Sequence, residues 1–162
     1  MRLATSLLLT ATLAAACAAP AEVTEKPHAL APPSPVVAAP REIPTPRPPA
    51  ACSGARACVD TVKRQAWLLN GSGLLAGPMP VSLGGPWHET PKGSFQVAWK
   101  DEVHTSRTYG IPMPYSVFFA PGGIAFHEGD VRTASHGCVH LRHADAAKVF
   151  TTLEHGDVVR VL

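Results

Sequence analysis

The sequence predicts a mainly β fold over residues 52–162, a β-sandwich-like domain with one C-terminal helix. Two observations support this. About seven short segments are apolar or alternate between apolar and polar residues, and turns rich in Gly, Pro and Asn separate them. A single segment, near the C-terminus, has its apolar residues at helical spacing. Many short strands with one helix favour two packed sheets with a helical attachment.

In the first half of this domain we expect strands over 59–62, 66–69 and 74–81. The sequence from Asn70 to Gly73 between the last two is typical of a hairpin turn, because Asn and Gly accept positive φ. A loop should follow over 82–90. Residues 95–99 then alternate between apolar and polar side chains, which predicts a half-buried strand.

In the second half we expect a long functional loop over 101–114, and buried strands over 115–120 and 124–127. In the latter strand, alternation points His127 away from the face that carries Phe126. The apolar positions of 143–153 recur at helical spacing, and Gly156 should stop that helix. A last strand is expected over 158–162.

Residues 1–17 have the layout of a signal peptide, with one basic residue, an uncharged Leu- and Ala-rich run, and small residues around Cys17. We therefore expect export to the cell envelope. The sequence before Cys17 also resembles a bacterial lipobox, so lipidation of Cys17 would give a membrane anchor. Cleavage after an Ala-x-Ala triplet is the alternative.

Residues 18–51 hold ten of the seventeen prolines, no aromatic residue and no apolar periodicity. This composition predicts a disordered Pro/Ala-rich linker, extended and partly of polyproline II type. The net charge of +2 gives no electrostatic footprint for nucleic acid. We expect a monomer.

Three of the four cysteines have an expected role other than catalysis. Cys17 belongs to the signal region, and Cys52 and Cys58 are close enough to form a disulfide in an exported protein. Cys138 is then the odd thiol of the domain. A free thiol is what a cysteine nucleophile requires.

The stretch Ala134-Ser135-His136-Gly137-Cys138-Val139-His140-Leu141 holds the candidate chemistry. A nearby imidazole such as His127 could take the thiol proton, and we expect an activated Cys138 to alkylate well below pH 8.5. Two other interpretations stay open. Cys138 could be an inert buried thiol, or it could bind zinc together with His127, His136 and His140.

Segments of the chain resemble the L,D-transpeptidases of bacterial cell walls, in particular the branch found in high-GC Gram-positive bacteria. The Ser-His-Gly-Cys core at 135–138 carries the resemblance, with further support from residues 90–95, 113–115 and 122–127. It implies an L,D-transpeptidase catalytic domain over 52–162. Cys138 would be the nucleophile and His127 the general base. His136 would orient groups beside the nucleophile, and the N–H groups of Gly137 and Cys138 would bind the oxyanion.

The resemblance also implies substrate contacts and a reaction. Tyr115 is expected to line the acyl-donor groove, and Ser135 and His140 to contact substrate, although His140 stands where the family usually has Arg or Asn. The implied reaction cleaves the bond before the terminal D-Ala of a peptidoglycan stem tetrapeptide and passes the acyl group to an amine of a neighbouring stem. It needs no metal and no organic cofactor, and it implies acylation by carbapenems. An L,D-carboxypeptidase and a degenerate peptidoglycan-binding lipoprotein are the alternatives.

Overall fold

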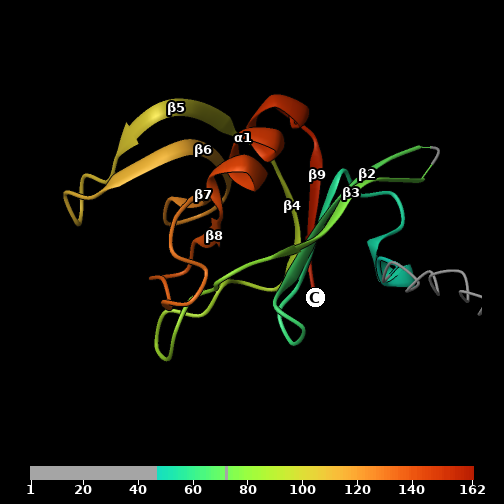
Figure 1. Ribbon diagram of the computed structural model, residues 1–162, viewed down its shortest axis with the longest axis horizontal. Helices are drawn as coiled ribbons and strands as arrows, with labels where there is room; N and C mark the ends of the chain where they lie inside the picture. Colours follow the sequence, from blue (N-terminus) through green and yellow to red (C-terminus); the bar gives the residue numbers. More distant parts are fainter. Residues whose placement is uncertain (1–46, 72) are drawn as a thin grey trace, which may run out of the picture. The chain divides into compact units, whose positions relative to one another are not determined.

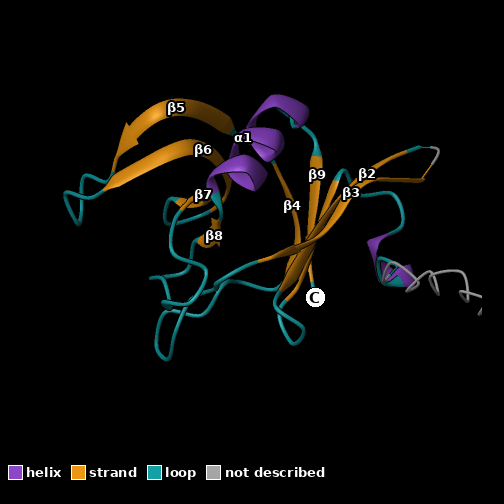
Figure 2. Cartoon of the chain, in the orientation of Figure 1, coloured by secondary structure: helices purple, strands orange, loops and turns teal. Residues whose placement is uncertain are grey.

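The computed structural model describes residues 47–71 and 73–162, and the predictions for residues 1–17, for Cys17 and for most of the linker lie outside these residues. The described residues form two sheets and one α-helix, as expected for a mainly β domain (Figure 2). No helix among them is long and apolar enough to cross a membrane.

The first sheet has five strands in the order β3-β2-β1-β9-β4. Their bounds are β1 Ala57–Asp60, β2 Gln65–Asn70, β3 Gly73–Pro80, β4 Gly93–Gln96 and β9 Val158–Val161. β1 pairs antiparallel with β2 and parallel with β9, so the C-terminal strand lies beside the first one. The expected hairpin joins β2 to β3, with Asn70 paired to Gly73.

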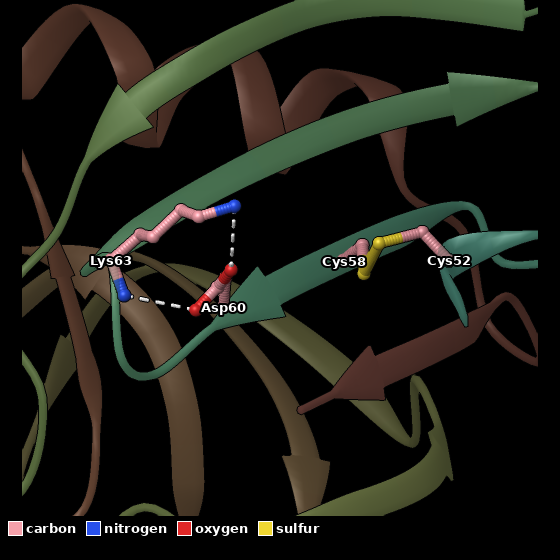
Figure 3. The surroundings of a disulfide bond; sticks show 4 residues. All are labelled: Cys52, Cys58, Asp60 and Lys63. Atoms are coloured by element: carbon pink, nitrogen blue, oxygen red, sulfur yellow. Dashed lines mark hydrogen bonds and ion pairs between the residues drawn. A yellow bond between two sulfur atoms is a disulfide. The ribbon is translucent and has the colours of Figure 1, made fainter. Parts of the chain in front are cut away.

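Local hydrogen bonds and a disulfide hold the start of this sheet (Figure 3). The Asp60 carboxylate accepts hydrogen bonds from the N–H groups of Val62 and Lys63 at 3.0 and 2.9 Å, which fixes the turn between β1 and β2. Cys58 of β1 forms a disulfide with Cys52, the last residue of the 3-10 helix Ala50–Cys52. Both half-cystines are buried, so this bond fastens the entrance of the domain to its core.

The second sheet has four strands in the order β5-β6-β7-β8. Their bounds are β5 Trp99–Thr105, β6 Pro112–Ala120, β7 Ile124–Glu128 and β8 Val139–Leu141. The first three are antiparallel neighbours, whereas β8 runs parallel to β7. In Figure 1 this sheet lies on the left, and α1 (His143–Thr152) lies at the top between it and β9.

One apolar core joins the two sheets and the helix. It contains Val59 and Leu68 of the first sheet, Phe126 and Val139 of the second, and Val149 of α1, all at most 1% exposed. Burial of apolar surface on this scale is the main favourable term in folding.

Two expectations for the middle of the chain are wrong. Residues 95–99 are not one strand, because the chain passes from one sheet to the other at Val97: its N–H donates to Asp157 O, while the N–H of Ala98 donates to Phe118 O. Residues 101–114 are mostly strand, since β5 runs to Thr105 and β6 begins at Pro112. The loop is only the short connection at 106–111.

Candidate active site

The pairing of β7 with β8 brings the sulfur and two imidazoles to one face of the sheet. Phe126 pairs with Val139 and His127 with His140, and Phe126 and Val139 both point into the core. Side chains alternate along a strand, so His127 and His140 lie on the opposite face. Cys138 directly precedes Val139 and shares that face, where it packs against a small cluster of Met113, Phe118 and Ala125.

The segment that carries Cys138 is held on its other side by residues 82–85. Ser82 and His140 exchange backbone hydrogen bonds at 3.2 and 2.9 Å. Further along, the N–H of Ser135 donates to Leu83 O at 2.9 Å, and Ser135 O accepts from the N–H of Gly85 at 3.1 Å. The Cys138 segment is therefore fixed between β7 and this second chain segment.

Ser135 fixes the backbone at Cys138. Its Oγ accepts the N–H of Gly137 at 3.1 Å and donates to Cys138 O at 2.6 Å. Gly137 has φ +110°, and a Cβ there would lie 2.5 Å from Cδ1 of Ile124, so the turn requires glycine. Of the two N–H groups expected to bind the oxyanion, that of Gly137 is therefore bonded to Ser135 Oγ in this structure. Ser135 thus makes structural hydrogen bonds while it also lines the cavity described below, where the substrate contact was expected.

His127 is held in the tautomer that a general base needs. Its Nδ1 lies 2.7 Å from Glu128 O, and because a carbonyl only accepts, Nδ1 carries the proton and Nε2 can accept one. Burial, together with the charges of His140 and His104, lowers the pKa of His127 from 6.5 to about 4, against the opposing effect of the hydrogen bond to Glu128. At neutral pH His127 is a neutral imidazole.

The thiol of Cys138 is likewise neutral in the resting site. Burial raises its pKa above the usual value, and a backbone hydrogen bond from Ala125 opposes this only in part. Its Sγ lies 3.8 Å from Gly123 O. Burial of the thiol therefore opposes the activation that the expected alkylation of Cys138 well below pH 8.5 would need.

The other two histidines near the sulfur make ring contacts. The His140 ring meets the His127 ring edge-on, with centroids 4.8 Å apart. The His136 ring stacks on Tyr109 at 4.4 Å and meets His88 at 5.0 Å. His136 thus contacts both the loop at 106–111 and the loop at 84–90 from the segment that carries Cys138.

Cys138, His127, Ser135, His136 and His140 all line one cavity of about 720 Å³. β5 and β6 also contribute to its lining, where Trp99 stacks on Phe118 at 3.8 Å and His104 meets both rings edge-on. Sequence reasoning missed Trp99 and Phe118 as lining residues. It marked 101–114 as a functional region, and His104, Arg107, Tyr109 and Ile111 of that region do line the cavity.

Tyr115 is not among the lining residues, contrary to expectation. Its ring packs edge-on against His143 and Phe150 of α1, at 5.4 and 5.9 Å. The physical reason is a break in the alternation of β6: Tyr115 has φ +58°, so its side chain joins the core side, whereas Met113, two residues earlier, faces Cys138.

Metal binding has no ligand set in the described part of the chain. Among residues 47–71 and 73–162, no group of three or more His, Cys, Asp or Glu side chains is placed to hold a metal ion. The zinc interpretation of the four residues considered above therefore finds no support in their positions.

Comparison with known proteins agrees with this fold. The family model for YkuD, the L,D-transpeptidase catalytic domain, matches residues 54–161. L,D-transpeptidase 1 of Mycobacterium tuberculosis is 29% identical over 123 residues, which cover 64% of this chain and 49% of the relative.

Two solved structures have the same fold. An L,D-transpeptidase from Stackebrandtia nassauensis aligns with a TM-score of 0.62 and 28% identity, covering 65% of this chain and 54% of that one. The L,D-transpeptidase LdtMt1 in complex with imipenem aligns with a TM-score of 0.59 and 26% identity, covering 65% and 57%. The chain spans about half the length of these relatives. Since the family model covers well over half of it, the chain belongs to the family of L,D-transpeptidase catalytic domains.

Proposed function

We propose that this protein is an exported peptidoglycan L,D-transpeptidase with Cys138 as its nucleophile and His127 as its general base. The observation that carries the proposal is the shared face of β7 and β8, where both side chains line one cavity and Nδ1 of His127 is bonded to Glu128 O. An imidazole with an unprotonated Nε2 beside a thiol can accept the thiol proton.

The first half-reaction forms a thioester. Sγ of Cys138 attacks the carbonyl carbon of the third residue of a stem tetrapeptide while His127 Nε2 takes the thiol proton. The tetrahedral intermediate then collapses, the C–N bond to the terminal D-Ala breaks, and the imidazolium returns the proton to the departing amine. Because both groups start neutral, charge develops only as the reaction proceeds.

The developing oxyanion needs a hydrogen-bond donor in this site. The Gly137 N–H is bonded to Ser135 Oγ, so we assign the donor role to the N–H of Cys138. A preorganised backbone donor of this kind contributes about 3 kcal/mol to transition-state stabilisation. The short bond from Ser135 to Cys138 O helps to hold the nucleophile's backbone in place.

The second half-reaction transfers the acyl group to an amine of a neighbouring stem. The amine attacks the thioester, His127 takes one amine proton and passes it to the leaving sulfur, and an amide and a free thiol result. If water attacks instead, the products are a tripeptide stem and the free enzyme, which is L,D-carboxypeptidase chemistry. Product analysis with a tetrapeptide donor, with and without an acceptor amine, separates the two activities.

The proposed place of action is the cell envelope. The signal-like residues 1–17 support export, and Cys17 would supply the lipid anchor. The disulfide between Cys52 and Cys58 fits an oxidising compartment.

Intact mass spectrometry with imipenem tests the proposal. The full-length chain should gain one imipenem adduct, and Cys138→Ala should gain none. Cys17→Ala is the matched control, since it removes a different thiol and should react like the parent. An adduct of unchanged yield in Cys138→Ala would remove the central assignment.

A further inference from the structure

The cavity beside Cys138 has an unusual charge composition. Of the residues that line it, one carries a permanent charge, Arg107, and four are histidines, of which His127 is neutral at pH 7. No Asp, Glu or Lys is among these lining residues. The cavity is therefore suited to a ligand that carries negative charge.

Arg107 has no partner among the described residues. Three other arginines each pair with a carboxylate: Arg56 with Asp157, Arg132 with Asp130 and Arg142 with Asp145. In the described part of the chain, no hydrogen bond or ion pair involves the Arg107 side chain. A guanidinium presents several N–H donors in a planar fork that matches a carboxylate, so Arg107 is free to bind one from a ligand.

The loop that carries Arg107 is fixed relative to the sulfur. Within it, the N–H of Ser106 donates to Ile111 O at 2.9 Å, and the N–H of Gly110 donates to Ser106 O at 2.8 Å. The ring of Tyr109 stacks on His136, two residues before Cys138. These contacts fix the loop of Arg107, which lines the same cavity as Cys138, so we place its guanidinium within the space that a ligand bound to Cys138 would occupy.

We propose that Arg107 binds a carboxylate of the donor stem peptide and is a specificity-determining residue of the site. The inference rests on the proposed function for the identity of the ligand. Two carboxylates of a stem tetrapeptide could serve: that of the terminal D-Ala, beside the scissile bond, and that on the side chain of the third residue. Both present the same chemistry to the guanidinium.

Binding measurements test this without turnover. The dissociation constants of three tetrapeptides are measured by calorimetry against full-length Cys138→Ala and against Cys138→Ala/Arg107→Gln. The peptides carry both carboxylates, a terminal amide, or a side-chain amide. With both carboxylates present, the Arg107→Gln change should weaken binding about 10- to 100-fold, as for other charge-assisted pairs.

The amide peptides identify which carboxylate is bound. The peptide that lacks the recognised carboxylate should bind both proteins equally, whereas the other amide peptide should keep the full difference. Arg107→Lys should recover part of the affinity because it keeps the charge. Lys148→Gln is the matched control, since it removes one exposed cation on α1 outside the cavity and should change nothing.

Two results overturn the inference. One is equal affinity of Cys138→Ala and Cys138→Ala/Arg107→Gln for the doubly charged peptide, and the other is the same loss of affinity for all three peptides. Failure of the proposed function looks different. In that case the parent chain with Cys138 intact forms no thioester with a peptide that it binds, whether or not Arg107 is replaced.

Discussion

The two sheets of this domain share one core, but they differ in whether they contribute residues to the cavity at Cys138. The five-stranded sheet contributes no residue to the cavity at Cys138, and the disulfide joins one of its strands to the preceding 3-10 helix. The four-stranded sheet supplies Trp99, Phe118, His127 and His140 to that cavity, and Cys138 directly precedes its last strand. Strand residues that line the cavity thus come from the four-stranded sheet alone, whereas both sheets contribute to the core.

This separation follows from the alternation of side chains in a strand. In β7 and β8 the residues that face the core are as apolar and buried as those of the other sheet, with Phe126 and Val139 at 1% and 0% exposure. Each residue that faces the cavity lies one position away from a core residue. A substitution on the cavity face should therefore change activity with little effect on folding, and the reverse should hold for the five-stranded sheet.

The largest effect is expected from His127→Gln on the cavity face. The variant loses the proposed general base, so kcat/KM for release of D-Ala from a tetrapeptide should fall about 10²- to 10⁴-fold. The free energy of unfolding in urea should change much less, because Gln keeps most of the volume and can donate to Glu128 O.

His155→Gln is the matched control for this variant. It makes the same chemical change at an exposed position outside the cavity and should keep the parent activity. If His127→Gln retained activity within a few-fold of the parent, another group would have to act as the base.

Most of the fold could be predicted from local signals. The hairpin at Asn70 and Gly73 rests on turn chemistry, and the helix expected over 143–153 is found over His143–Thr152 because its apolar spacing is unambiguous. The crossing at Val97 could not be predicted. Alternation of apolar and polar residues looks the same whether the chain stays in one sheet or changes to another.

The candidate site was only partly predictable. Residue chemistry and the family resemblance indicated Cys138 and His127, but β8 was not expected, since its three residues are strand only through pairing with β7 and Ser82. Tyr115 was misplaced because a positive φ in the middle of a strand interrupts the alternation of sides on which the expectation depended. The neutral state of the thiol depends on burial, which sequence spacing does not give.

Removal of the disulfide should have an intermediate effect. It tests the five-stranded sheet, where a change should alter stability and leave activity unchanged. Replacing Cys52 and Cys58 together by Ala removes a short covalent loop, so the free energy of unfolding in urea should fall by about 2 kcal/mol. The rate of acylation by imipenem should stay at the parent value, because neither residue lines the cavity. The parent chain treated with a reductant is the control. It loses the same disulfide but keeps both cysteine side chains, so it separates the effect of the bond from that of the substitutions. If the rate of acylation fell together with the free energy of unfolding, the cavity would depend on the five-stranded sheet and the comparison would fail.

The smallest expected effect is a shift in the pH dependence of kcat/KM when His140 is replaced. The proposed base, His127, can accept a proton only when neutral, so the acid limb of kcat/KM should follow its pKa of about 4. His140→Gln removes a nearby positive charge that lowers this pKa, so the limb should move to higher pH. It should stay below 6.5, because burial is the largest cause and is unchanged.

His104→Gln provides a graded comparison, since His104 has the weaker influence on His127 and its removal should move the limb less. The same pKa has a consequence for folding. Between pH 6.5 and about 4 the unfolded chain takes up a proton at His127 and the folded chain does not, so this group makes the fold less stable as the pH falls through that range. In His140→Gln this loss should be smaller, and urea unfolding at pH 4.5 and 7 measures it. An acid limb that stays in place in both variants would show that the charges on this face of the sheet do not tune the base, and burial alone would then account for its low pKa.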